Sequence, residues 1–355
     1  MKKFKLTIPF FSIAILTLFS CHKNKDEGAD NVVNQTNKKD ILASFCINTS
    51  QATYSDLANK VALLNDAISV FDTSSTEINL TKCKDLWRGS RSAWEQSEGF
   101  LFGPAATDNI DPKIDTWPVD YVALDSVLNS AAIFTGTYIN NLDDALRGFH
   151  PVEYLLFGKN GSKKAIEFSA REKQYLTALS TNLKSLTASL SESWNNGYAN
   201  HVITAGTNGS VYATQLAAYE EIVNSLIDIC DEVANGKIET PFLAQDPNLE
   251  ESPFSKNSIT DFTNNIKSVQ NVYEGKYIND GKGLEDLVKS QNLSLNASIK
   301  NKITAALNAL NAITVPFGEA ILTQQVQVKN AQNAIRELKN ELDKNLLPFI
   351  KQHVI

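Results

Sequence analysis

The chain has 355 residues, 43% of them hydrophobic and 21% charged, which is the composition of a globular protein of about two domains and excludes a disordered or low-complexity chain. Its formal net charge of −7 excludes a nucleic-acid binder that relies on a basic surface. The four cysteines, Cys21, Cys46, Cys83 and Cys230, are too few for a disulfide scaffold and form no Cys-x-x-Cys pair.

The N-terminal residues 1–20 are typical of a signal peptide. Three lysines precede an apolar run over residues 6–19, which is shorter than the about 20 residues of a membrane-spanning helix. Ser20 and Cys21 follow this run, and a small residue before cysteine at this place resembles the lipobox of bacterial lipoproteins. The resemblance implies cleavage before Cys21 and lipidation of that cysteine; a plain secretory signal with a fortuitous cysteine is the alternative.

Residues 21–40 are polar and predict a flexible tether. No apolar stretch after residue 40 is long enough to span a membrane. We therefore expect a cell-envelope protein that is lipid-anchored to the outer membrane, on its periplasmic side or at the cell surface.

Beyond the tether, apolar residues recur at alternating steps of three and four, which predicts helices that each bury one stripe. The stripes are Tyr54, Leu57, Val61, Leu64, Ile68 and Phe71; Leu176, Leu179, Leu183, Leu186, Leu190 and Trp194; Leu216, Tyr219, Val223, Leu226, Cys230 and Val233; Ile303, Leu307, Leu310 and Ile313; and Val328, Ala331, Ile335, Leu338, Leu342 and Leu346. Gly236 would cap the third helix. The sequence has no comparable set of alternating strands, so we expect an all-α protein with bundle packing.

A proline-containing segment, residues 238–258, predicts the connection between an N-terminal bundle over residues 41–237 and a C-terminal bundle over residues 259–355. Residues 91–102 and 267–278 share Ser, Glu and Gly at the same offsets, which favours an internal duplication. This alignment pairs Glu98 with Glu274, but Glu95 with Asn271.

His150 and Glu153 form the first candidate site. Residues three apart share a helix face, so the imidazole and the carboxylate could bind one metal ion. Pro151 disfavours a helical His150, although it suits the first turn of a helix that starts there. In the alternative interpretation Glu153 only caps that helix and His150 packs against it.

A second acidic pair, Glu95 and Glu98, lies on one face of a predicted helix beside Trp94. The loop that follows contains Asp115. Carboxylates on one helix, together with a histidine and a carboxylate on another, are a sensible ligand set for iron, zinc or a related ion. The alternative is that Glu95 is solvated and that Glu98 pairs with Arg91 or another cation.

The motif Gly148-x-His150-x-x-Glu153 resembles the signature of the imelysin family (peptidase family M75). Residues 91–98, the Phe-Gly-Pro sequence after them and residues 115–118 also resemble the arginine- and glutamate-containing helix of that family and its following loop. The resemblance covers about residues 40–355. It implies two helical bundles that arose by duplication, a metal site near the His-x-x-Glu motif, and a link to iron uptake or other metal handling in the bacterial envelope.

The preferred hypothesis is a non-catalytic, lipid-anchored protein that binds a metal ion or a metal-containing ligand and takes part in iron uptake. His150, Glu153, Glu98, Glu95 and Asp115 are the candidate ligands of a divalent or ferric ion, with iron favoured and zinc possible. Gly148 would permit a close approach of the backbone. Arg91 would orient a carboxylate or bind an anionic group of a chelated metal.

A metal-dependent peptidase and a structural or adaptor lipoprotein without a ligand are the two alternatives. The peptidase has support from the family name alone, because the sequence has no His-Glu-x-x-His motif and Tyr154 takes the last histidine position of the inverted form. The expected partners are the outer membrane and an iron-uptake transporter or receptor, and no nucleic acid.

Overall fold

The computed structural model describes residues 38–354, so the predicted signal peptide, Cys21 and tether residues 21–37 lie outside the described residues. The described chain is helical and contains no β-strand; one isolated bridge joins Lys276 and Asp280. The prediction of an all-α fold is therefore confirmed. None of the helices in residues 38–354 combines the length and the hydrophobicity that crossing a membrane requires.

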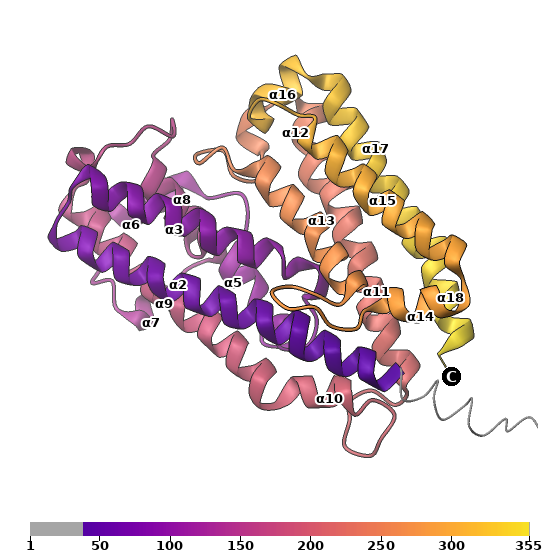
Figure 1. The fold of residues 1–355 in the computed structure, drawn as a ribbon. Coiled ribbons are helices and arrows are strands. Elements are labelled where there is room, and N and C mark those ends of the chain that lie inside the picture. Colours follow the sequence, from indigo (N-terminus) through magenta and orange to yellow (C-terminus); the bar gives the residue numbers. More distant parts are fainter. Residues whose placement is uncertain (1–37, 355) are drawn as a thin grey trace, which may run out of the picture. The chain divides into compact units, whose positions relative to one another are not determined.

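The first group of helices packs around α2 and α9 (Figure 1). Helix α2 contacts α3 and α9, and α8 contacts the same two helices. Residues 38–44 are helical and run directly into the following elements. These are η1 (Phe45–Ser50), α2 (Gln51–Thr73), α3 (Glu77–Glu95), η2 (Glu98–Phe100), α4 (Pro104–Thr107), α5 (Asp111–Asp115), α6 (Tyr121–Asn129), α7 (Gly136–Asn140), η3 (Asp144–Leu146), α8 (Phe149–Phe157), η4 (Ala165–Glu167), α9 (Ala170–Ser193), η5 (Trp194–Tyr198) and α10 (Ala199–Ile203).

The second group packs around α13 and α17. Helix α15 contacts both of them, and α11 does the same from another side. The elements are α11 (Gln215–Glu232), η6 (Val233–Ile238), α12 (Glu239–Ala244), η7 (Pro247–Leu249), α13 (Ser258–Glu274), α14 (Leu284–Gln291), α15 (Leu293–Asn311), α16 (Phe317–Thr323), α17 (Gln325–Glu341), η8 (Leu342–Leu346) and α18 (Leu347–His353). The elements η1, η5, η6 and η8 are π-helical turns inside longer helices.

The predicted apolar stripes form the core. Every residue of the first and last stripes is buried, and the members of the other stripes are buried or pack against the buried cluster. Cys230 is buried at its stripe position, and Cys46 and Cys83 are also buried and free. The apolar periodicity predicts the buried residues correctly because one face of a helix returns to the core every three to four residues.

Three of the predicted boundaries differ from the structure. Residues 38–40 of the predicted tether are helical, and the Lys38 carbonyl accepts a hydrogen bond from the Tyr219 hydroxyl at 2.8 Å. Helix α11, assigned from sequence to the N-terminal bundle, packs on α13, α17 and α18 and also contacts the turn η2 of the first group. Gly236 does not end that helix, which continues through η6 to Ala244.

The predicted linker, residues 238–258, is folded. It contains α12 and η7, and Glu250, Glu251 and Ser252 within it are buried. Pro241 lies in the first turn of α12, where the missing N–H of a proline breaks no hydrogen bond within that helix. The π-helical turn η6 directly precedes this helix. The prolines of this segment therefore do not indicate an extended connection.

Helices α3 and α13 pack against each other where the two groups of helices meet. They carry the two aligned segments, and the side chain of Asn271 donates a hydrogen bond to that of Gln96 at 3.1 Å. The internal duplication stays a prediction. This junction places polar side chains from both groups in one buried region.

Candidate functional site

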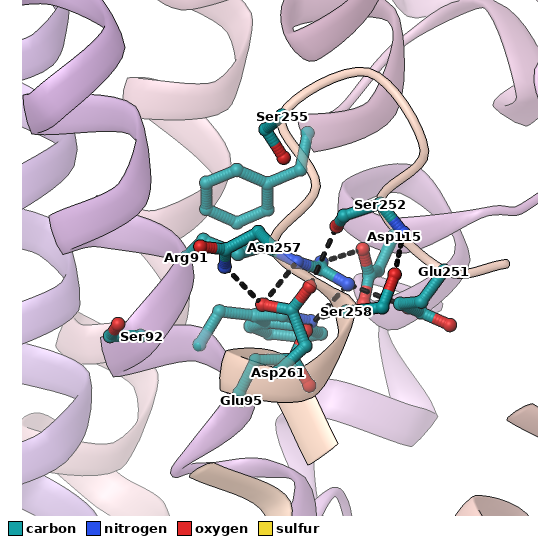
Figure 2. A network of polar contacts seen from close by, with 12 residues as sticks. Arg91, Ser92, Glu95, Asp115, Glu251, Ser252, Ser255, Asn257, Ser258 and Asp261 are labelled. Carbon is teal, nitrogen blue, oxygen red and sulfur yellow. Dashed lines mark hydrogen bonds and ion pairs between the residues drawn. The ribbon is translucent and has the colours of Figure 1, made fainter. Parts of the chain in front are cut away.

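Arg91 on α3 lies at the centre of this region and is fully buried. Its Nη2 atom is 2.5 Å from Glu95 Oε1 and 2.6 Å from Glu251 Oε1. Its Nη1 atom bonds to Asp115, and its Nε atom lies 3.8 Å from Asp261 Oδ1 (Figure 2). Burial acts to lower the pKa of Arg91, but these four carboxylates raise it well above its ordinary value. The guanidinium therefore stays charged and joins α3, α5, α13 and the segment before α13.

His150, in the first turn of α8, is also fully buried. Its Nε2 atom lies 3.1 Å from Asp115 Oδ1 and 3.7 Å from Glu251 Oε1. Neither ring nitrogen has a partner with hydrogen-bond geometry among the described residues. Burial and the Arg91 guanidinium act to lower the pKa of His150, but Asp115 and Glu153 outweigh them and raise it to about 9. The imidazole therefore faces a carboxylate at each ring nitrogen, Asp115 at Nε2 and Glu153 at Nδ1.

Gly148 makes the approach of α8 to α5 possible. Its φ angle is +87°, and a Cβ atom there would lie 2.2 Å from the carbonyl oxygen of Ile114, next to Asp115. The carboxylate of Asp115 is held on its other side by the indole N–H of Trp94, which donates to Oδ2 at 2.6 Å. Both features place Asp115 against His150, as expected for a glycine that permits close approach.

Glu153 lies on the opposite side of the imidazole. Its Oε1 atom accepts two hydrogen bonds from Ser255, and its Oε2 atom lies 3.7 Å from His150 Nδ1. The predicted pair of His150 and Glu153 is thus close in space, but Glu153 faces the ring nitrogen that points away from Asp115 and Glu251. This geometry suits a residue that orients the histidine.

Glu98 begins the short turn η2 after α3, and its Oε2 atom accepts two hydrogen bonds. The donors are Lys237 Nζ at 2.9 Å and Asn265 Nδ2 at 2.7 Å. Asn265 also donates to Glu95 Oε2 at 2.6 Å. Burial and the neighbouring Glu95 raise the pKa of Glu98 well above its ordinary value, and burial also raises that of Glu95. A cation bound beside them would favour the charged form of both acids.

Carboxylates outnumber fixed cations in this cluster. The six acids are Glu95, Glu98, Asp115, Glu153, Glu251 and Asp261; the two fixed cations are Arg91 and Lys237, and His150 adds a third positive charge when its ring is protonated. Two sets offer ligand atoms within 4.8 Å of one another: Asp115, His150 and Glu251, and Glu95, Glu98 and Asp115. Buried carboxylates are costly unless cations or hydrogen bonds compensate them, so the arrangement favours a further positive charge.

A cavity of about 450 Å³ opens onto the cluster. Glu98, Asp115, Glu251 and Lys237 line it on the side of the cluster, and Asp111 and Glu232 line it elsewhere. His150 is not among the lining residues, so the cavity reaches the carboxylates first.

The structure brings together all the residues that the sequence proposed as ligands. Glu251, Lys237, Asp261 and Asn265 were missed. Asp261 and Asn265 are buried polar residues four apart on α13, and this spacing is a signal that the sequence did contain. His201 lies apart, on α10, where its ring packs against Tyr198.

Comparisons with known proteins agree with this architecture. The family model described as Imelysin matches residues 50–344. Iron-regulated protein A of Synechococcus elongatus is 30% identical over 330 residues, which cover 90% of this chain and 87% of that protein.

Two solved structures are similar over most of their length. The crystal structure of a candidate iron-regulated protein A precursor from Parabacteroides distasonis has a TM-score of 0.81 and 26% identity, covering 90% of this chain and 95% of the other. An imelysin-like protein from Psychrobacter arcticum has a TM-score of 0.74 and 14% identity, covering 89% and 96%, and shows the fold alone. The chain therefore belongs to the imelysin family.

Proposed function

We propose that this protein is a cell-envelope lipoprotein that binds a metal ion at the junction of its two helix groups, without catalysis, in iron uptake. The observation that carries the proposal is the buried excess of carboxylates around a histidine whose two ring nitrogens have no hydrogen-bond partner in residues 38–354. Iron is favoured because two relatives are named for regulation by iron; zinc is the second choice.

The donor set fits such an ion. Imidazole nitrogen and carboxylate oxygens suit iron, manganese and zinc. Asp115 Oδ1 and Glu251 Oε1 lie 3.1 and 3.7 Å from His150 Nε2, a spacing compatible with one ion at bond lengths of about 2.0–2.2 Å. Glu95 and Glu98 would supply the adjoining acidic set. A bound cation would neutralise the carboxylates that exceed the fixed cations.

Arg91 and Glu153 would support the ligands and not bind the ion themselves. Arg91 fixes the carboxylates of Asp115 and Glu251 through its guanidinium. Glu153 lies beside the second ring nitrogen of His150, where hydrogen-bonded neighbours of a ligating histidine usually lie. This division revises the sequence-based hypothesis, in which Glu153 was a ligand.

Binding is favoured over peptide hydrolysis because the described cluster offers a single histidine. The common zinc peptidases take two histidines and a further carboxylate as ligands. A purely structural role is less favoured because six acids face two fixed cations in the described cluster.

The location and the partner belong to the same proposal. Lipidation at Cys21 would attach the protein to the outer membrane, on the periplasmic side or at the surface, close to an iron-uptake transporter or receptor. The support is the signal-peptide pattern of residues 1–20. The Cys21→Ser variant should move from the membrane fraction to the soluble fraction, and unchanged membrane attachment would contradict lipidation.

The metal proposal is tested by anaerobic calorimetric titration of the purified, metal-free protein with Fe²⁺. The wild type should bind with a saturable, fixed stoichiometry. His150→Ala and Glu251→Gln should lower the affinity at least tenfold, whereas Glu153→Gln should keep the stoichiometry. His201→Ala is the matched control and should bind like the wild type.

Two outcomes would contradict the proposal. If the wild type binds no Fe²⁺ or Zn²⁺, and His150→Ala only lowers the thermal stability, the cluster is structural. If the metal-loaded protein cleaves casein, and if Glu153→Gln abolishes that cleavage, the family's peptidase activity is present here.

A further inference from the structure

The cavity over the cluster is acidic. Five of the ionisable residues that line it are acids and one is a base. We call it the acidic pocket, and its ionisable lining residues are Glu98, Asp111, Asp115, Glu232, Glu251 and Lys237. Such a surface attracts cations and repels anions. An independent sign of a ligand is His150, which lies fully buried behind the pocket with an unpartnered Nε2 atom facing Asp115 and Glu251.

Lys237 places its ammonium group where a cation would sit. Its Nζ atom lies within 4 Å of four carboxylates: Glu98 at 2.9 Å, Glu251 at 3.4 Å, Glu232 at 3.6 Å and Glu95 at 3.8 Å. The Lys237 side chain is only 9% exposed, so water screens these contacts little. An ammonium is a compact single charge. One such charge faces more negative groups than it can neutralise.

Glu232 and Gly236 lie beside Lys237 at the acidic pocket. The Glu232 side chain is 58% exposed and already contacts Nζ. The neighbouring Gly236 leaves open space, because a Cβ atom there would meet nothing closer than Glu232 Cγ at 4.0 Å. Both residues line the acidic pocket together with Lys237. Glu232 is therefore an exposed ionic partner at the pocket, to which the Lys237 ammonium already lies at 3.6 Å.

We infer that Lys237 is a tethered counter-ion that a hydrated metal cation displaces as it enters through the acidic pocket, so that the site takes free cations and not haem or an anionic ferric chelate. The inference rests on the proposed function and names its ligand class. The propionates of haem and the carboxylates of a ferric chelate would meet the acidic wall. His150, which does not line the pocket, is out of reach of a porphyrin-bound iron.

The test is anaerobic titration of the purified protein with Fe²⁺, and parallel titrations with ferric citrate and haemin. Lys237→Gln removes the competing charge and should bind Fe²⁺ at least tenfold more tightly than the wild type. Lys237→Arg keeps the charge and should show no gain. Lys339→Gln is the matched control, since Lys339 pairs with Asp231 at 3.3 Å outside the pocket, and it should change the affinity less than twofold.

The outcomes separate this inference from the metal proposal itself. If His150→Ala abolishes Fe²⁺ binding but Lys237→Gln binds no more tightly than the wild type, the counter-ion role is wrong and the metal site stands. If no variant binds Fe²⁺, both are wrong. Ferric citrate or haemin binding more tightly than Fe²⁺ would overturn the ligand class. Circular dichroism checks that Lys237→Gln is folded. Its melting temperature should rise more on adding Fe²⁺ than that of the wild type.

Discussion

Glu153 accepts two hydrogen bonds from Ser255, one from the backbone N–H at 2.7 Å and one from the hydroxyl at 2.6 Å. This contact ties the His-x-x-Glu helix α8 to the segment that carries Glu251. The two candidate ligands His150 and Glu251 come from different helix groups, so their mutual position depends on such ties. Glu153 thus acts in the site through the segment that it holds as well as through the imidazole.

Removing one or both of these hydrogen bonds should lower the free energy of unfolding by different amounts. Ser255→Ala deletes the hydroxyl donor and should cost about 1.5 kcal/mol, because a hydrogen bond to a charged group contributes that much. Glu153→Ala leaves both Ser255 donors without their acceptor and should cost about 3 kcal/mol. Urea denaturation measures both losses. The control is Ser69→Ala, whose hydroxyl makes an exposed hydrogen bond within its own helix; an equal loss in Ser69→Ala and Ser255→Ala would contradict the prediction.

Gly148 should be intolerant of any side chain. Gly148→Ala forces a Cβ atom to within 2.2 Å of the Ile114 carbonyl oxygen at a φ of +87°, so α8 must move away from α5. The matched control is Gly209→Ala, which has a φ of +96° but no atom within 4 Å of the added Cβ. Backbone strain of about 1–2 kcal/mol is common to both variants. Gly148→Ala should lose at least about 2 kcal/mol more in urea denaturation, and equal losses would show that the close approach does not matter.

The part of the site that sequence could predict is the part encoded locally. Arg91, Glu95 and Glu98 are spaced three to four apart, so their common location follows from helical periodicity. His150 and Glu153 are likewise three apart at the start of a helix. Their assembly into one cluster was inferred from the chemistry of metal ligands and from a family resemblance, because nothing in the local sequence states that two distant helices meet.

The missed residues come from the other helix group. Glu251 is 160 positions from Arg91, and it lies in a segment whose prolines and polar residues are typical of a linker. Lys237 follows Gly236, which is typical of a helix end, although a π-helical turn carries the helix through this point. Both errors have one cause: the preferences of a local segment were overridden by tertiary contacts at the junction of the helix groups.

Arg91 should contribute strongly to the stability of the fold. Arg91→Ala leaves the carboxylates of Glu95, Asp115 and Glu251 buried without their main cation, and this should cost at least about 3 kcal/mol. Arg91→Lys keeps the charge but loses the planar fork that contacts several carboxylates at once, so it should recover only part of the loss. Urea denaturation gives the values. Arg336→Ala is the control, because the Arg336 side chain is 34% exposed and pairs with Glu239; a loss of about 1 kcal/mol or less is expected there. A loss no larger than that of the control would show that the network contributes little.

Asp111 should make stability depend on pH. Burial, together with the carboxylates of Asp115 and Glu232, raises the pKa of Asp111 from 3.8 to about 6. The folded state therefore binds this proton more tightly than the unfolded state, and the stabilisation is complete below about pH 4 and is lost as the pH rises through 6. Asp111→Asn keeps the shape without the charge, so its stability should equal that of the wild type near pH 4 and exceed it by about 1–2 kcal/mol above pH 6. Urea denaturation in EDTA across this range measures the difference, and the exposed Asp125→Asn serves as the control. A difference in stability between Asp111→Asn and the wild type that stays constant with pH would show that folding does not raise the pKa of Asp111.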